Sequence, residues 1–269
     1  MRRSLFVFVA IGSYQLSALL AVEVGAQEQH SRIEGMWSDP PVSIFDTFCQ
    51  RVCTEVSVAR LETLLDDPAN AHRQLSDLMS DAQAYATNEY VRPRLTDAAL
   101  EDFPLDPADD PSFLECEPYG IAAQVTARHQ VKFRNADDRI EMQYGEWAAR
   151  RTIYMDGRRP PEGAPHTPMG YSVGRFEGDE LVIETSHISP RVIRRVGYFR
   201  HSDQLRLEER YSVSEDGQLL TLTITYEDPW SLKEPLVAKK VWGWAPDEEI
   251  YPELDCEVPT DFFRRGDEQ

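Results

Sequence analysis

The chain has 269 residues and is strongly acidic, because 28 Lys and Arg against 47 Asp and Glu give a formal net charge of −19. Such a surface repels phosphate backbones and anionic lipids, which argues against binding of nucleic acid or of membrane surfaces. The simplest interpretation of this charge is solubility in an exposed compartment.

Residues 1–26 have the pattern of a cleaved signal peptide. Arg2 and Arg3 precede a long apolar segment, and small residues suited to signal-peptidase cleavage end at Ala26. Polar residues interrupt the segment and no basic flank follows it, so a membrane anchor is the less favoured alternative. We therefore expect a soluble periplasmic or secreted protein that is cleaved after Ala26, with twin-arginine export as an alternative to the general secretory route.

Residues 27–110 are expected to form a helical N-terminal segment packed on the rest of the molecule. In "DDPANAHRQLSDLMSDAQAYATNEY", Asp67 can cap a helix whose first turn holds Pro68. Apolar side chains then recur at three- and four-residue steps and form one stripe. A shorter helix is expected around residues 58–65, and another begins after Thr96 as its cap.

Four cysteines in an exported chain allow three complete disulfide pairings. Cys116 and Cys256 bracket almost all of the strand-like sequence, so we expect them to pair, which leaves Cys49 with Cys53. In the chain-entropy model, a bridge that closes so long a loop contributes about 5 kcal/mol. The spacing of the four cysteines fits a zinc site poorly.

Residues 111–258 are expected to form one antiparallel β-domain, followed by a solvated tail at 259–269. Apolar and polar residues alternate at 139–144 and 220–226, which is typical of strands with one buried face. Eight or so short strands joined by tight turns favour a β-barrel, with a β-sandwich as the alternative. Further strands are expected at about 130–134, 150–156, 169–176, 181–185, 203–213 and 236–244.

The stretch "GYSVG", Gly170 to Gly174, matches the G-x-S-x-G motif that presents a nucleophilic serine in many esterases. That role requires a helix directly after the serine. Here "RFEGDELVIET" follows, which is a polar turn and then a second strand. Ser172 is therefore predicted to lie within a hairpin strand and not to be a nucleophile.

The same region resembles a family of uncharacterised exported bacterial proteins. The segments "EWAARRTIYMDGRRPP", "MGYSVGRFEGDELVIET", "HSDQLRLEERYSV" and "TLTITYEDP" carry its D-G-R, G-[HY]-S-x-G-x-[WF]-E-G-D-x-L-V, H-S and E-R motifs in order. The resemblance covers residues 116–256 and implies a small lipocalin-like β-barrel, but no established reaction. Tyr171 stands where many relatives have histidine, which argues against a catalytic role at that position.

One carboxylate is expected inside the barrel. In "LRLEERYSV" the alternation places Glu209 on the same face as Leu207 and Tyr211. A buried carboxylate needs a partner or becomes protonated. The alternation in "MGYSVGRF" places Arg175 on a face with Tyr171, so an inward Arg175–Glu209 ion pair is the simplest expectation, and such a pair often only fixes register.

Other candidate site residues lie near the expected barrel rims. His201 could form an acid-base pair with Glu209, although a hydrogen-bonded rim histidine is the commoner case. Arg158, in "DGR", is a candidate for binding a carboxylate, and Trp242 shares a strand face with Trp244 and is a candidate for lining a ligand cavity.

No metal or other cofactor is expected. His166, His187 and His201 show neither H-x-H nor H-x₃-H spacing, so a metal centre built from them is disfavoured.

Three functions remain open from the sequence. We favour binding of a small, partly apolar ligand in the barrel mouth, with polar recognition by Tyr171, Arg175, His201 and Glu209. The second is a hydrolase- or isomerase-type enzyme in which His201 or Glu209 is the general base and Arg175 or Arg158 holds an anionic intermediate. The third is an envelope scaffold without a pocket that uses its helical part for protein contacts.

Overall fold

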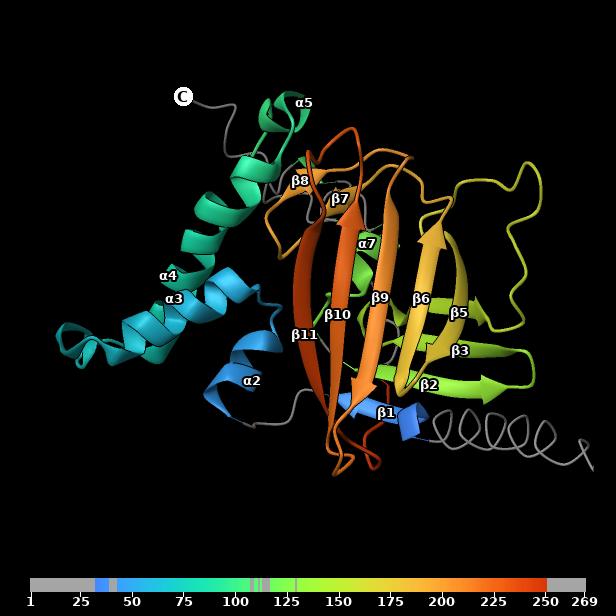
Figure 1. Ribbon diagram of the computed structural model, residues 1–269, viewed down its shortest axis with the longest axis horizontal. Coiled ribbons are helices and arrows are strands. Elements are labelled where there is room, and N and C mark those ends of the chain that lie inside the picture. The colour runs from blue at the N-terminus through green and yellow to red at the C-terminus, as the bar shows by residue number, and fades with distance from the viewer. Residues whose placement is uncertain are drawn as a thin grey trace, which may run out of the picture.

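The computed structural model describes residues 32–38, 43–106, 109–110, 112, 117–128 and 130–250. Nine strands form a closed barrel in the order β1-β11-β10-β9-β6-β5-β4-β3-β2, which confirms the mainly β class and the barrel (Figure 1). The expected signal peptide, Cys116, Cys256 and the expected tail at 259–269 all lie outside the described residues.

The strands lie close to their expected positions. All neighbours in the barrel are antiparallel except β4 and β5, which pair in parallel over only two residues of each strand. A separate two-stranded sheet contains β7 (Val192–Ile193) and β8 (Phe199–Arg200). The barrel strands are β1 (Gly35–Ser38), β2 (Val131–Ala136), β3 (Arg139–Tyr144), β4 (Arg150–Tyr154), β5 (Tyr171–Glu177), β6 (Glu180–Ser186), β9 (Arg206–Val213), β10 (Leu219–Glu227) and β11 (Leu236–Trp244).

Strand β1 closes the barrel, although it lies in the segment for which we expected helices. It pairs with β11 through Trp37 and Trp244 and with β2 through Gly35 and Phe133. The Trp37 side chain is fully buried, and its ring meets that of Trp244 edge to face at 5.0 Å. The expected barrel boundary at residue 111 is therefore corrected, because four residues are too short to display an alternating pattern.

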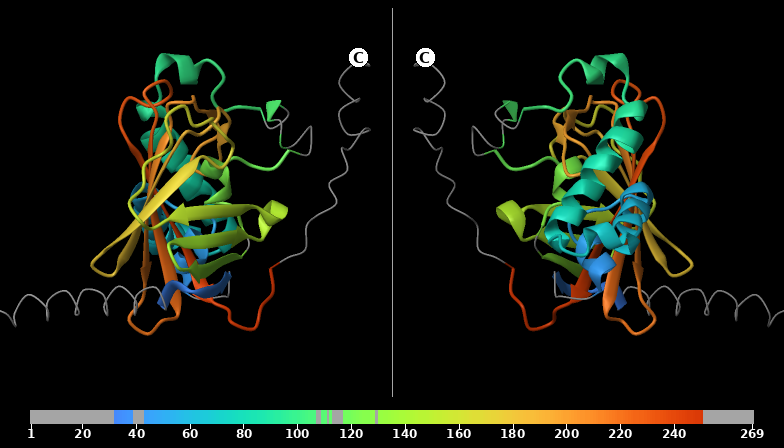
Figure 2. Two further views of the ribbon diagram at one scale, coloured as in Figure 1. Left: turned by 90° about the vertical axis from the view of Figure 1, so that its right-hand side faces the viewer. Right: turned by 90° about the vertical axis from the view of Figure 1, so that its left-hand side faces the viewer.

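The helices lie mainly outside the barrel wall. They are α2 (Ile44–Cys49), α3 (Glu55–Asp66), α4 (Leu75–Ala86), α5 (Asp97–Leu100) and α7 (Ile121–Gln124). Figures 1 and 2 show α3 and α4 as a hairpin beside β11. A disulfide joins Cys49 to Cys53, as expected, and Cys53 pairs with Lys239 of β11. Within the described residues, no helix has the length and apolar character needed to cross a bilayer.

The expected long helix after Asp67 is interrupted. Asp67 accepts a hydrogen bond from the amide of Ala69, but it caps only a single 3₁₀ turn, Pro68–Asn70. That turn buries no side chain, whereas α4 buries Leu78 and Ala82 against α3. The cap residues were therefore correctly recognised, but they cap a short turn, and α4 begins only at Leu75.

Side chains and one short helix fill the barrel interior. Figure 1 shows α7 behind the wall formed by β9 and β10. All four residues of α7 are buried, and Tyr226 of β10 donates a hydrogen bond to the carbonyl of Ala122 at 3.3 Å. Trp242 is buried in the same core, 1% exposed, with its ring stacked on that of Tyr211. These described side chains and α7 therefore form part of the core inside the barrel.

Candidate functional site

A buried ion pair lies at the centre of the barrel. Glu209 of β9 points inward and is fully buried, as the alternation predicted. Its partner is Arg151 of β4, whose side chain is 1% exposed, and their Oε1 and Nη2 atoms are 2.7 Å apart. Tyr211 adds a hydrogen bond of 2.9 Å from its hydroxyl to Glu209 Oε2.

The Arg151 guanidinium uses all five of its N–H donors. Nε donates to Ser172 Oγ at 2.9 Å, and Nη2 donates to Thr185 Oγ1 at 2.7 Å as well as to Glu209. Nη1 donates to Glu209 Oε2 at 2.9 Å and to the Tyr144 hydroxyl at 3.3 Å. Side chains from β3, β4, β5, β6 and β9 therefore converge on one cation, across the short parallel junction of β4 and β5.

Burial fixes the protonation states in this cluster. It raises the pKa of the Tyr144 hydroxyl to about 12 and that of Tyr211 well above its usual value. Burial alone would lower the pKa of Arg151, but the Glu209 carboxylate outweighs it and raises that pKa. Burial therefore favours neutral phenols beside the Arg151–Glu209 ion pair, an arrangement typical of a structural network.

The predicted Arg175–Glu209 pair is wrong. Arg175 lies on the outer face of β5, where it binds Glu177 and Glu184. The alternation correctly grouped Tyr171 with Arg175, but that face points outward. The inward face holds Ser172 and Gly174 instead. Position 174 has no room for a side chain, because an added Cβ would lie 2.6 Å from Met155 and 2.7 Å from Ile153.

Ser172 is buried in β5, 2% exposed, and contacts Arg151 and Thr185. Strand β6 follows it after a turn, as expected for a residue that is not in a nucleophile elbow.

His201 and Glu209 belong to different hydrogen-bond networks. Glu209 contacts Arg151 and Tyr211, whereas His201 Nδ1 lies 2.9 Å from the carbonyl of Ser202. The Ser202 hydroxyl in turn donates to Asp228 at 2.6 Å. The structure therefore places these two candidates without a shared proton path among the described contacts.

The largest hollow near the predicted site residues lies on the outside of the barrel. It measures about 670 Å³, and β5, β6, β9 and β10 form its floor. A second hollow of about 550 Å³ shares several of its residues and extends it toward His166 and Asp203. We call the two together the outer groove. Its members that matter below are Arg158, Arg159, Tyr171, His187, Arg206 and Glu227.

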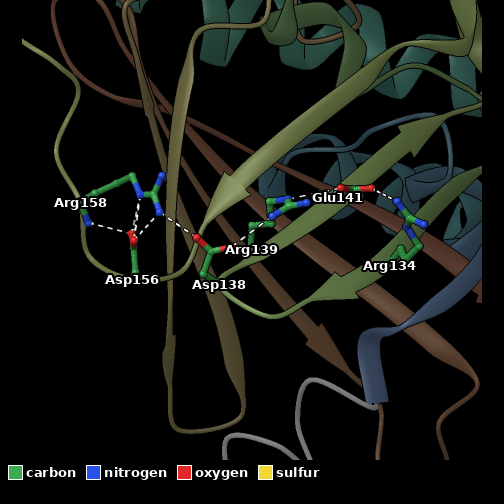
Figure 3. Close-up of polar contacts among 6 residues, drawn as sticks. All are labelled: Arg134, Asp138, Arg139, Glu141, Asp156 and Arg158. Atoms are coloured by element: carbon green, nitrogen blue, oxygen red, sulfur yellow. Dashed lines mark hydrogen bonds and ion pairs between the residues drawn. The ribbon is translucent and has the colours of Figure 1, made fainter.

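The connection between β4 and β5 forms one wall of the outer groove. Arg158 in this connection binds Asp156 and reaches Asp138 at the β2–β3 turn with a distance of 2.8 Å (Figure 3). Arg139 and Glu141 continue the chain of charges to Arg134 (Figure 3). Arg158 thus lines the groove as a candidate site residue, but two aspartates already hold its guanidinium.

A pair of histidines, His166 and His187, lines the second hollow of the outer groove. A parallel bridge between Thr167 and Ile188 brings His166 beside His187, with their ring centroids 5.3 Å apart. His187 has a positive φ of 56°, and its Nδ1 lies 2.9 Å from the Ser186 hydroxyl. Residues other than glycine that adopt the left-handed conformation cluster at binding sites.

Among the described residues, two arginines and Glu227, which is paired with Arg206 in the β9–β10 register, have no ion-pair partner in the outer groove. Glu184 binds Arg175 and Glu208 binds Arg210, so both of these carboxylates are neutralised. Within the described part of the chain, no ion pair involves the guanidinium of Arg159 or of Arg206. An unpaired cation is notable here because the whole chain carries a net charge of −19.

Sequence reasoning placed two residues of the outer groove, Tyr171 and Arg158, in the candidate site. It missed Arg159 and Arg206, because the hollow that they share depends on which strands are neighbours in the barrel. Arg175 and Trp242, also candidates, are not among the residues that line the groove.

No group of three or more His, Cys, Asp or Glu side chains within the described residues is arranged to hold a metal ion. Comparison with family models, with curated proteins and with solved structures finds no match to this chain.

Proposed function

We propose that this protein binds a small, partly apolar organic anion in the outer groove. The observation that carries the proposal is the pair of guanidinium groups, Arg159 and Arg206, that line one hollow without an ion-pair partner in the described residues. Arginine recognises carboxylate and sulfonate groups through parallel charge-assisted hydrogen bonds. The ligand therefore carries its charge between these two side chains.

The other lining residues suit the remainder of such a ligand. Tyr171 and Val173 offer apolar surface beside the arginines. The Tyr171 ring stacks on the Tyr154 ring, with 5.1 Å between the ring centroids. The guanidinium carbon of Arg158 lies 4.4 Å from the centroid of the Tyr154 ring. A volume of about 670 Å³ lies within the range of about 300–1,000 Å³ that is typical of small-molecule sites.

This proposal moves the ligand from the inside of the barrel to its outside. Trp242, Tyr211 and α7 are buried in the core, whereas the unpaired arginines line the outer groove, which favours the outer site. The enzyme alternative loses its expected His201–Glu209 pair for the reason given above, and the scaffold alternative predicts that the groove binds nothing.

The first test uses 1-anilinonaphthalene-8-sulfonate, an aromatic anion whose fluorescence rises on binding. The variant Arg206→Gln should weaken binding by up to about fivefold, because Arg206 is exposed and an exposed ion pair contributes about 0–1 kcal/mol. The matched control is Arg150→Gln, which removes an exposed arginine from a different hollow on β4. Equal affinity in the wild type, Arg206→Gln and Arg150→Gln would refute the groove as the binding site.

We also propose that the mature protein is exported and begins after Ala26. Sequencing the N-terminus of the protein recovered from the periplasm or medium tests this directly, and an intact Met1 on the recovered protein would contradict it.

A further inference from the structure

A glutamate lies next to one of the two arginines on which the proposed function depends. Glu227 on β10 and Arg206 on β9 are register partners, and both residues line both hollows of the outer groove. Directly opposed residues on antiparallel strands have Cβ atoms about 4.5–5.5 Å apart. Both side chains are exposed, and neither forms an ion pair among the residues that the structure describes. The part of the groove that the two hollows share therefore presents a cation and an anion on neighbouring strands.

The lining of the outer groove carries both signs of charge. Three arginines and three glutamates line the hollow of about 670 Å³, and the second hollow adds Asp203. The whole chain has a net charge of −19, so its field repels a ligand that is only an anion. A ligand that carries an ammonium group next to its carboxylate has no net charge and avoids this repulsion. Its ammonium group also gives Glu227 a partner.

An aromatic ring lies at the other end of the groove floor. Strands β5, β6, β9 and β10 lie side by side (Figure 1), and their register places four outward residues in one row: Tyr171, Ser186, Arg206 and Glu227. Neighbouring strands are about 4.8 Å apart, so about 10 Å separate the backbones at Tyr171 and Arg206. An apolar side chain of the ligand can lie over Ser186 and against the Tyr171 ring, while the charged end of the ligand lies at Arg206 and Glu227.

We propose that the ligand of the outer groove is an aromatic α-amino acid, whose carboxylate binds Arg159 and Arg206 and whose ammonium group binds Glu227. An α-amino acid carries its two charged groups on one carbon atom, which suits a cation and an anion on neighbouring strands. The aromatic side chain packs against Tyr171. This inference rests on the proposed function, because it keeps the carboxylate between the two arginines and adds a second charge.

The test compares L-phenylalanine with 3-phenylpropanoate, which has the same ring and carboxylate but lacks the ammonium group. Titration of the ¹⁵N-labelled protein, followed in amide ¹H–¹⁵N spectra, gives the affinity for each compound. The amide signals of Ser186 and Thr225 report occupation of the groove floor. L-Phenylalanine should bind about two- to fivefold more tightly than 3-phenylpropanoate, which is the effect of one exposed ion pair.

Two variants separate the contact with Glu227 from the effect of net charge. Glu227→Gln should weaken L-phenylalanine binding about two- to fivefold and should not weaken binding of 3-phenylpropanoate. Glu215→Gln is the matched control, because it removes the same charge from the exposed β9–β10 turn, at the opposite end of these strands, and should change neither affinity. Both replaced glutamates are exposed, so neither variant opens the core.

The outcomes distinguish this inference from the proposed function. Equal binding of L-phenylalanine to the wild type and Glu227→Gln, or equal weakening in Glu215→Gln, overturns the amino acid as ligand. If 3-phenylpropanoate still binds in a manner that depends on Arg206, the groove remains an anion site and only this inference fails. If neither compound nor the sulfonate probe shifts the signals of Ser186 and Thr225, both proposals fail together.

Discussion

Two networks of arginine and carboxylate side chains in this barrel differ in exposure, because one is buried and the other lies on the surface. Arg151 and Glu209 are enclosed in the core, with side chains 1% and 0% exposed. The chain from Arg134 to Arg158 crosses the outer surface, and its members are 31–67% exposed (Figure 3). The comparison separates a pair on which the architecture depends from pairs that only arrange a surface.

Exposure decides the energetic role of each network. Water solvates exposed ions, so an exposed pair contributes only about 0–1 kcal/mol. A buried pair gains little over apolar residues of similar volume, but removal of one partner leaves an uncompensated charge in a medium of low polarity. The inner network is therefore intolerant of single substitutions, and the outer one tolerates them.

The largest effect is expected for Glu209→Gln. This variant leaves the Arg151 cation in the core without its anion, and it should lower the free energy of unfolding in urea by about 3–5 kcal/mol. The double variant Arg151→Met/Glu209→Leu should recover most of that loss, since it removes both charges. A loss below 1 kcal/mol in Glu209→Gln would show that water reaches the pair.

A much smaller effect is expected for Arg139→Gln in the outer network. Arg139 binds Asp138 at 3.2 Å and Glu141 at 3.3 Å, and all three side chains are partly solvated. The free energy of unfolding should fall only slightly, because water solvates these exposed charges. The difference from wild type should vanish in 1 M NaCl, where the screening length is about 3 Å. A salt-independent loss would contradict a surface role.

The smallest effect on stability concerns pH. Hydrogen bonds from the Arg158 side chain lower the pKa of Asp156 from 3.8 to about 2. The lowered pKa in the folded state means that the contribution of this carboxylate is complete above pH 3.8 and is lost as the pH falls toward 2. A carboxyl ¹³C titration should give a midpoint near 2 in the wild type and a midpoint near the ordinary value in Arg158→Gln.

Asp216 serves as the internal reference in that titration. Its pKa is also lowered, by a hydrogen bond from Ser214 in the β9–β10 turn, and should not respond to Arg158→Gln. A simultaneous change at Asp216 would indicate a global effect of the substitution.

The sequence predicted the inner network only in part. Alternation gave the inward position of Glu209 because Leu207 and Tyr211 flank it in a regular strand. The same alternation at 150–155 groups Arg151 with Ile153 and Met155, so the sequence pattern also indicates an inward Arg151, the true partner of Glu209. In β5 the face with more apolar residues points outward. The inward residues have small side chains, because Ile153 of β4 and the adjacent Met155 lie close to Gly174.

The outer groove was beyond the sequence. Arg206 on β9 and Tyr171 on β5 become neighbours of one hollow only once the order β5-β6-β9-β10 is known. A linear pattern gives the face of each strand but not the strand beside it. The buried state of His201 likewise depends on β7 and β8, which are each two residues long and show no periodicity.

The parallel pairing of β4 with β5 has an evolutionary consequence. Two parallel neighbours cannot be joined by a tight hairpin, so the chain must travel the length of the strand before it returns. Residues 155–170 make this excursion, and part of them bounds the outer groove. Variation in the length and composition of this connection can change what the outer groove recognises, while the nine-stranded barrel stays unaltered.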